Sequence, residues 1–315
     1  MTVGVPLLLR RRVLAAKIET TVGTAETLTA AEAAMNIFEP TINPTIEFEE
    51  RPGQGVFSPL PGVLGAYGAT TSFQTEITGR GSSGGSVPLW ASTFLPACGF
   101  VDNGSGVFGP VSKAPGVGGV KTVTIGAYQD GVFKRIRGAM GTFVITLVAG
   151  KIARIQFTFT GIWDAPTDAA MLAPTYPTVS PLRFVSSQLA VGSWNPKLSE
   201  LSIDAGNQVA LREDAGDASG FCSAVIGNRR TTGSMNPEAS LVADNDNYGD
   251  WLGRTEQALG LQLGSGVNRV DIDAPKLQFT NTQEGDRNNI KIDTIEFQLN
   301  RSAAAGDDDL TIDFN

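Results

Sequence analysis

The chain has 315 residues, enough for a sizeable hydrophobic core and for about two domains of average size. It contains no histidine and only two cysteines, Cys98 and Cys222, which excludes Ser-His-Asp and Cys-His triads, histidine-ligated zinc and a disulfide framework. The formal net charge of -8 argues against an outer surface that grips nucleic acid by its phosphates. No apolar run is long enough for a membrane-spanning helix, so we expect no membrane partner.

The chain begins with a segment that we interpret as an N-terminal arm, residues 1–29. Its apolar residues 5–9 precede the three arginines at 10–12, which is the reverse of the order found in a secretory signal peptide. Across the end of this arm, Thr29 and Glu32 have the spacing of a capping box. A short helix is therefore expected over residues 27–34.

Residues 30–165 are mostly typical of strands and turns. Apolar and polar side chains alternate over residues 123–127, 142–148 and 155–159. Clean alternation with a polar opposite face indicates half-buried antiparallel sheets rather than a doubly wound parallel sheet. One helix is expected here, over residues 88–97. We interpret the whole segment as a first β domain.

Residues 166–181 contain four prolines and no periodic pattern, so we expect a linker. Strand patterns return in residues 182–315, together with a further expected helix over residues 246–258. We interpret this part as a second β domain. The predicted fold class is thus mainly β, with two tandem β-sandwich or barrel domains and one flanking α-helix on each.

A weak internal repeat supports this division. The pattern K-I-x-x-I-x-F occurs at residues 151–157 and again at residues 291–297. In each half a tryptophan precedes a glycine by nine residues: Trp90 and Gly99, then Trp251 and Gly260. Both intervals cover an expected helix, and each glycine could supply a left-handed C-cap. Order and spacing together predict a duplication.

Three sequence motifs could mark a nucleotide-binding, calcium-binding or other carboxylate site, but each fits a structural role better. Residues 79–84 fit G-x-G-x-x-G by letter, but no helix pattern opens from the glycines. Residues 244–249 resemble a calcium loop, yet Tyr248 and Thr255 stand at two ligand positions, and we interpret the acidic residues as a helix cap. Residues 307–309 are interpreted as a solvated turn. We expect no catalytic, cofactor-binding or metal-binding residues, and no enzyme.

Six segments are informative in combination: residues 17–24, 141–144, 150–161, 165–168, 204–209 and 229–233. Together they resemble the major tail tube proteins of long-tailed, siphovirus-type bacteriophages. The resemblance implies a virion structural protein, assembled in the host cytoplasm, whose subunits form rings that stack into a hollow tail tube. In that family a β-sandwich with a flanking helix contributes strands to a continuous inner barrel.

The resemblance also implies partners. These are the tail terminator, distal tail proteins and tape measure protein, with double-stranded DNA passing through the lumen without specific binding. Because the chain looks duplicated, a ring of three chains could imitate six domains, with six chains as the alternative. The apolar loop 101–119 and the N-terminal arm are expected to contact neighbouring chains. A different class of function, an adhesin-like β-sandwich binding module without catalytic activity, is the alternative.

Overall fold

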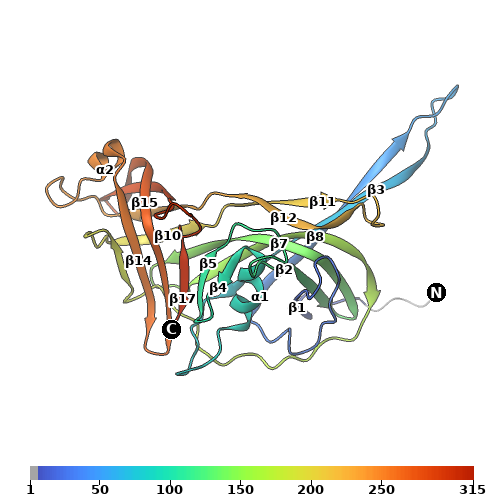
Figure 1. The fold of residues 1–315 in the computed structure, drawn as a ribbon, viewed down its shortest axis with the longest axis horizontal. Helices are drawn as coiled ribbons and strands as arrows, with labels where there is room; N and C mark the ends of the chain where they lie inside the picture. Colours follow the sequence, from blue (N-terminus) through green and yellow to red (C-terminus); the bar gives the residue numbers. More distant parts are fainter. Residues whose placement is uncertain (1–5) are drawn as a thin grey trace.

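The protein is described by a computed structural model that covers residues 6–315 (Figure 1). It is mainly β: one sheet connects 15 strands, and a separate two-stranded sheet is formed by a hairpin. Two short helices complete the regular structure. The predicted mainly β class is confirmed.

The first half of the chain forms an antiparallel sheet with one helix packed on it. Its elements in chain order are β1 (Arg12–Ile18), β2 (Ile37–Arg51), β3 (Leu60–Glu76), α1 (Leu89–Ala97), β4 (Phe100–Asp102), β5 (Val107–Pro110), β6 (Val123–Gln129), β7 (Val132–Val148) and β8 (Arg154–Asp168).

The second half repeats this plan with a shorter helix. Its elements are β9 (Gln188–Val191), β10 (Leu198–Asp204), β11 (Asn207–Glu213), β12 (Phe221–Arg229), β13 (Thr232–Pro237), α2 (Asn247–Gly253), β14 (Glu256–Ser265), β15 (Asn268–Arg287), β16 (Ile290–Leu299) and β17 (Thr311–Phe314).

The strands form where the sequence alternates between apolar and polar residues. Ile155, Phe157 and Phe159 on β8 are buried, whereas the residues between them are at least partly exposed. A period of two places successive side chains on opposite faces, so one face of the sheet faces the core and the other faces solvent. Helix α1 covers the core face and is buried along most of its length.

The two halves have the same strand order. The first half runs β2-β3-β8-β7-β6-β1, and the second runs β10-β13-β16-β15-β14-β9. Phe157 on β8 lies opposite Phe73 and Phe143. Phe297 on β16 lies opposite Gly233 and Phe279, on the matching strands. The two copies of K-I-x-x-I-x-F therefore occupy equivalent strands.

The halves are joined through their backbones and through their core. Strand β7 pairs with β10, with Ile145 opposite Ile203, so the two sheets continue into each other. Strand β17 of the second half pairs with β5 of the first, and the ring of Phe314 lies 5.5 Å from Trp90 of α1. One cluster of buried side chains includes residues of both halves. The division at residues 166–181 remains a prediction.

Some expectations were wrong in detail. The sheet is open: β1, β2, β4 and β9 each pair on one side only, so within residues 6–315 it does not close into a barrel in one chain. Residues 27–34 form turns rather than a helix: Ala34 donates its N–H to Ala31, and the carbonyl of Glu32 accepts the N–H of Ala16 on β1. Helix α2 ends at Arg254, which takes the left-handed C-cap conformation, and Gly260 lies inside β14. Gly99 does adopt a positive φ (+76°) directly after α1.

The apolar loop 101–119 is used inside the chain. It forms β4 and β5, and Phe108 is fully buried against Phe314 of the second half. Phe108 is therefore not free to contact a neighbouring chain, whereas Val117 of the same loop is 54% exposed. The contact of this loop with neighbouring chains stays a prediction. The expected N-terminal arm also differs: residues 1–5 lie outside the described residues, and residues 12–18 form β1, paired with β6.

Replacing Phe157 by alanine should destabilise the protein by about 3–5 kcal/mol, because the ring is fully buried and leaves a cavity. Phe94 lies 5.2 Å and Phe73 5.7 Å from it, centroid to centroid. Urea denaturation of unassembled protein measures the change. The control is Gln156→Ala on the neighbouring exposed position, with an expected change within about 0.5 kcal/mol. Equal losses would contradict the assignment of the two faces.

Candidate assembly surfaces

The face of the main sheet opposite the core is polar. Residues that lie opposite each other across the ladders share a face, so the registers define rows of side chains across the strands. One row runs from β3 to β16 and consists of Glu76, Arg154, Thr146, Ser202, Ser234 and Glu296. The next row consists of Gln74, Gln156, Val144, Asp204, Thr232 and Gln298. We call these two rows the open face.

The charge of the open face is acidic. Arg154 is its single base, whereas Glu76, Asp204 and Glu296 are acidic. Glu200, two residues from Ser202 along β10, adds a fourth carboxylate on the same side. The remaining side chains are mostly neutral amides and hydroxyls. Such a surface is well hydrated and repels phosphate rather than binding it.

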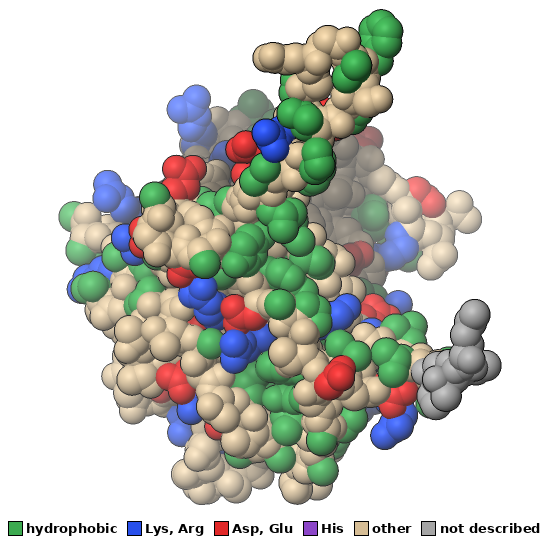
Figure 2. All heavy atoms as spheres, turned by 90° about the vertical axis from the view of Figure 1, so that its right-hand side faces the viewer, with side chains coloured by type: hydrophobic (Ala, Val, Ile, Leu, Met, Phe, Trp, Pro, Cys, Tyr) green, Lys and Arg blue, Asp and Glu red, His purple; other side chains and the backbone are tan. Residues whose placement is uncertain are grey.

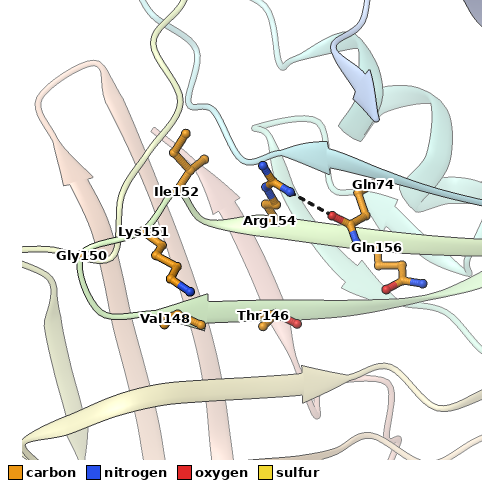
Figure 3. Close-up of a pocket in the computed structure, with 8 residues that line it drawn as sticks. All are labelled: Gln74, Thr146, Val148, Gly150, Lys151, Ile152, Arg154 and Gln156. Atoms are coloured by element: carbon orange, nitrogen blue, oxygen red, sulfur yellow. Dashed lines mark hydrogen bonds between the residues drawn. The ribbon is translucent and has the colours of Figure 1, made fainter. Parts of the chain in front are cut away.

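A shallow hollow of about 550 Å³ lies at one border of the open face (Figure 3). It is lined by side chains of β3, β7 and β8 and by the turn between β7 and β8. Arg154 donates a hydrogen bond of 3.3 Å to Gln74 and points across the hollow, and Lys151 lies on the turn. Among the residues that line it there are two cations and no carboxylate. The hollow can therefore contact an anion, but it offers no acid–base pair for catalysis.

Several strands of the main sheet have an unpaired edge among the described residues, including the short strands β1, β4 and β9. Two of the unpaired edges, on β2 and β15, lie in long strands of the two halves. Strand β2 ends the sheet, with β3 on one side only. Strand β15 is paired with β14 up to Gln278, and from Asn281 to Arg287 it is paired only with β16 among the described residues. Unpaired edge strands present rows of backbone N–H and C=O groups that can bind another strand.

Strands β2 and β3 continue beyond the sheet as a long two-stranded arm, which projects from one end of the molecule (Figure 1). We call residues 42–71 the first hairpin. Its distal part is apolar and exposed: Phe48 is 62% and Leu64 69% exposed, and Phe57 at the tip is fully exposed. Figure 2 shows these hydrophobic side chains along the projecting arm. Its exposed large apolar residues are Ile46, Phe48, Val56, Phe57, Leu60, Val63 and Leu64.

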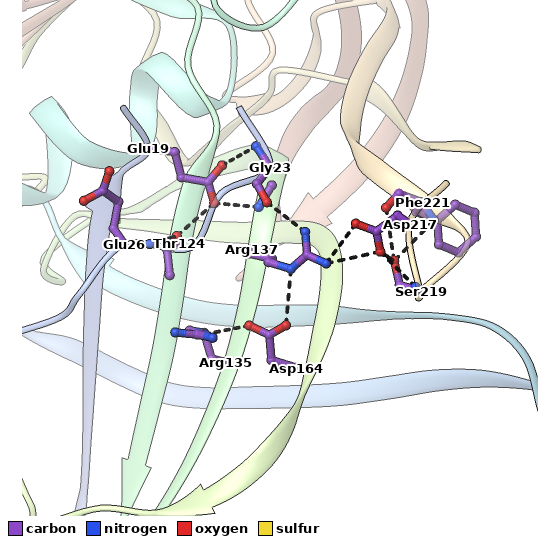
Figure 4. A network of polar contacts seen from close by, with 11 residues as sticks. Glu19, Gly23, Glu26, Thr124, Arg135, Arg137, Asp164, Asp217, Ser219 and Phe221 are labelled. Atoms are coloured by element: carbon purple, nitrogen blue, oxygen red, sulfur yellow. Dashed lines mark hydrogen bonds and ion pairs between the residues drawn. The ribbon is translucent and has the colours of Figure 1, made fainter. Parts of the chain in front are cut away.

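Residues 205–231 form a corresponding second hairpin, with strands β11 and β12, which packs on the first half instead of projecting. Arg137 of β7 anchors it: the guanidinium contacts Asp217 at 3.2 Å and Asp164 at 3.3 Å (Figure 4). Backbone and side-chain hydrogen bonds from Ser219, together with Arg137, lower the pKa of Asp217. The carboxylate is thus held ionised between the hairpin and the sheet.

A buried carboxylate ties the N-terminal segment to the same region. Glu19 is 2% exposed and accepts hydrogen bonds from the backbone of Gly23 (2.8 Å) and Gly138 (2.6 Å). The hydroxyls of Thr122 and Thr124 donate two more. Nearby, the pKa of Glu26 is lowered to about 2, mainly by the backbone N–H of Thr20 and by Lys17. These contacts order residues that the sequence assigned to an arm.

The glycine-rich motif at residues 79–84 and the calcium-loop-like motif at residues 244–249 both have structural roles. Gly79 donates its N–H to Asn268 of the second half, and α1 begins only at Leu89, so no helix opens from residues 79–84. Asp246 caps α2 by accepting the N–H of Gly249 at 2.7 Å, as expected.

Residues 307–309 are not a solvated turn, which corrects the expectation. Asp309 is 8% exposed and accepts hydrogen bonds from Arg229 at 2.9 Å and Thr231 at 2.7 Å. Asp307 accepts the N–H of Ser112 in the first half. Arg229 contacts both Asp307 (3.5 Å) and Asp309 (2.9 Å), and Asp308 accepts a hydrogen bond from Ser302 at 2.6 Å. These contacts fasten the chain before β17.

The two cysteines differ. Cys98 is fully buried, and desolvation raises the pKa of its thiol well above 9.0, whereas Cys222 is half-buried. Over residues 6–315 no group of three or more Asp, Glu, Cys or His side chains is arranged to hold a metal ion. No helix in that range is long and apolar enough to cross a membrane.

Sequence comparison agrees with these surfaces. The family described as phage tail tube protein matches residues 10–315, which is nearly the whole chain. A comparison with curated proteins finds no match. A mainly β subunit with unpaired sheet edges and an exposed apolar hairpin is suited to self-assembly, and the chain belongs to the phage tail tube protein family. It is accordingly a structural component of the phage tail.

The first hairpin and the free edges were missed at the sequence level. The alternation of Ile46 and Phe48 with glutamates, followed by the turn residues Pro52 and Gly53, does predict a hairpin. It does not reveal that both faces of the hairpin stay exposed, since exposure depends on what the rest of the chain covers.

Replacing Glu19 by glutamine should lower the free energy of unfolding by about 1–3 kcal/mol, because an amide cannot accept all four hydrogen bonds and buries an extra donor. Thermal or urea unfolding measures the loss. Glu213→Gln on exposed β11 is the control and should change stability little. An unchanged Glu19→Gln protein would show that the buried carboxylate does not hold the N-terminal segment.

Proposed function

We propose that the chain forms rings of three subunits, each of which imitates two of six equivalent domains, and that these rings stack into the tail tube. The equal strand order of the two halves supports the proposal. Each chain has one unpaired edge at β2 and another at β15, so head-to-tail contacts can close a ring when the rotation between chains is right. Six chains per ring remain the alternative stoichiometry.

The tube would carry double-stranded DNA during ejection into the host. The open face is the surface that supports this role, because it is polar and its two rows carry three carboxylates against one base. Glu200 lies beside the rows, as do the cations Lys151 and Arg230. Each phosphate contact by a lysine or arginine would add affinity, and rings repeat any contact many times, so a basic lumen would retard a moving duplex. DNA therefore passes without specific binding.

Other tail proteins complete the assembly in this proposal. The tail terminator and distal tail proteins would bind the two ends of the tube, and the tape measure protein would occupy its lumen before ejection. Assembly would take place in the host cytoplasm, and the mature location would be the virion tail. Two apolar surfaces, the first hairpin and the residues around α2, are available for contacts between subunits.

Electron microscopy of purified protein tests the proposal. We expect hollow tubes or rings, and averaged end views should show three chains and six similar domains per ring. Six chains per ring would replace the trimer by the alternative. Monomers at every concentration and salt condition would contradict a tube subunit and favour a binding module.

The lumen assignment has its own test. Reversing the charge of Glu200 and Glu296 to lysine should make assembled tubes bind linear duplex DNA, with an affinity that falls steeply as salt rises. Asp168→Lys, at the far end of β8, is the matched control and should leave binding undetectable. Filter binding at several salt concentrations measures the effect. Tight, salt-sensitive binding by the unmodified tube would argue against an acidic lumen.

A further inference from the structure

The two halves of one chain are connected by the pairing of β7 with β10. Because the two halves have the same strand order, this pairing is a template for the contact between neighbouring chains. Strand β6 pairs with one edge of β7 as far as Ala139. Further along β7, from Val144 to Val148, β10 of the second half pairs with that edge. By strand order β10 corresponds to β2, and β7 corresponds to β15. Both counterparts have an unpaired edge: β2 along the side away from β3, and β15 from Asn281 to Arg287. This argument rests on the proposed self-assembly of the chain.

We propose that β2 of one chain pairs with residues 281–287 of β15 in the next chain, in the register that the β7–β10 join sets. The repeated motif fixes that register. Arg154 corresponds to Thr294, and their ladder partners Thr146 and Gln283 therefore correspond to each other. Gln156 corresponds to Glu296 in the same way.

The other strand of the contact follows by the same steps. Gln156 lies opposite Gln74, which lies opposite Phe38 on β2. Glu296 lies opposite Ser234, which lies opposite Ser202 on β10. Phe38 is thus the counterpart of Ser202. Since Ser202 lies opposite Thr146 within the chain, Phe38 lies opposite Gln283 of the neighbouring chain.

The hydrogen-bond pattern of the template identifies the kind of pair. Ala205 donates to Phe143 at 3.0 Å, and Ala149 donates to Ser199 at 2.8 Å. Hydrogen-bonded and non-hydrogen-bonded pairs alternate along an antiparallel ladder, so Ser202 and Thr146 form a non-hydrogen-bonded pair. The Cα atoms of such a pair are about 4.5 Å apart, which is within reach of a disulfide.

The hairpins extend the template. The second hairpin packs Val209, Leu211 and Ile226 against apolar residues of the first half. The first hairpin has nearly the same length, follows the counterpart strand and projects with its apolar residues exposed. It would lie across the second half of the next chain, where Leu241, Val242 and Leu252 beside α2 are 73%, 71% and 80% exposed. Figure 1 places the hairpin and α2 at opposite ends of the molecule, as a head-to-tail ring requires.

Cysteine cross-linking tests the register. In a Cys222→Ser background, the double variant Phe38→Cys with Gln283→Cys should, after oxidation of assembled protein, run as covalent dimers and trimers on a non-reducing gel and as monomers after reduction. Thr146→Cys with Ser202→Cys is the matched template and should cross-link within one chain, without multimers. Phe38→Cys with Asn281→Cys is two residues out of register and should cross-link poorly, because diagonal neighbours are about 7–8 Å apart.

The outcomes separate this interface from the proposed function. Tubes that form but cross-link through Asn281, or through neither residue, would overturn the β2–β15 register and leave the tail tube function standing. An unmodified chain that never assembles would refute both. If the double variant itself does not assemble, mixing the Phe38→Cys and Gln283→Cys single variants should give a covalent dimer, and its absence would count against the interface.

The hairpin contact has a separate measurement. Leu252→Glu should reduce the yield of sedimentable tubes by about tenfold or more at a fixed protein concentration, because it places a charge in a buried apolar contact. Tyr176→Glu changes a 48% exposed residue away from α2 and should assemble normally. Equal assembly of both variants would show that the residues around α2 receive no hairpin.

Discussion

Every strand in an antiparallel sheet has two edges, and each edge must bind either another strand or water. This constraint explains which strands of the molecule pair with one another and which edges stay unpaired. The first half has a free edge on β7, and the chain satisfies it with its own β10. Strand β2 and the last part of β15 each have an edge with no partner strand among the described residues. An incomplete sheet within one chain is thus a direct consequence of a repeated unit whose edges match each other.

Packing between the halves makes the repeated unit rigid. Phe314, near the end of the second half, meets Trp90 and Phe108 of the first half in one core. Buried aromatic contacts of this kind contribute more to stability than the burial of apolar area alone. They also fix the angle between the halves. A fixed angle is what a closed ring requires, since a small error in rotation would give an open helix instead.

Several local features could be predicted because they depend on neighbours in the sequence. The alternation around Phe157, the N-cap at Asp246 and the left-handed Gly99 all follow from short-range geometry. Others could not. The capping box at Thr29 and Glu32 forms its hydrogen bond, yet no helix follows, and the carbonyl of Glu32 is bound by Ala16 of β1 instead. Asp309 looks like part of a solvated turn until Arg229 and Thr231 are brought to it from far along the chain.

The sequence by itself determined the mainly β class, the repeat and the absence of histidine chemistry, since these depend on residue types and their period. Only the tertiary structure decided which apolar residues become core and which stay exposed. Phe108 and Phe57 both stand in glycine- and proline-containing segments, yet one is buried and the other fully exposed. The difference is that β17 returns to cover Phe108, whereas no described part of the chain reaches the tip of the first hairpin. Burial is a property of the partner surface, which a local pattern does not contain.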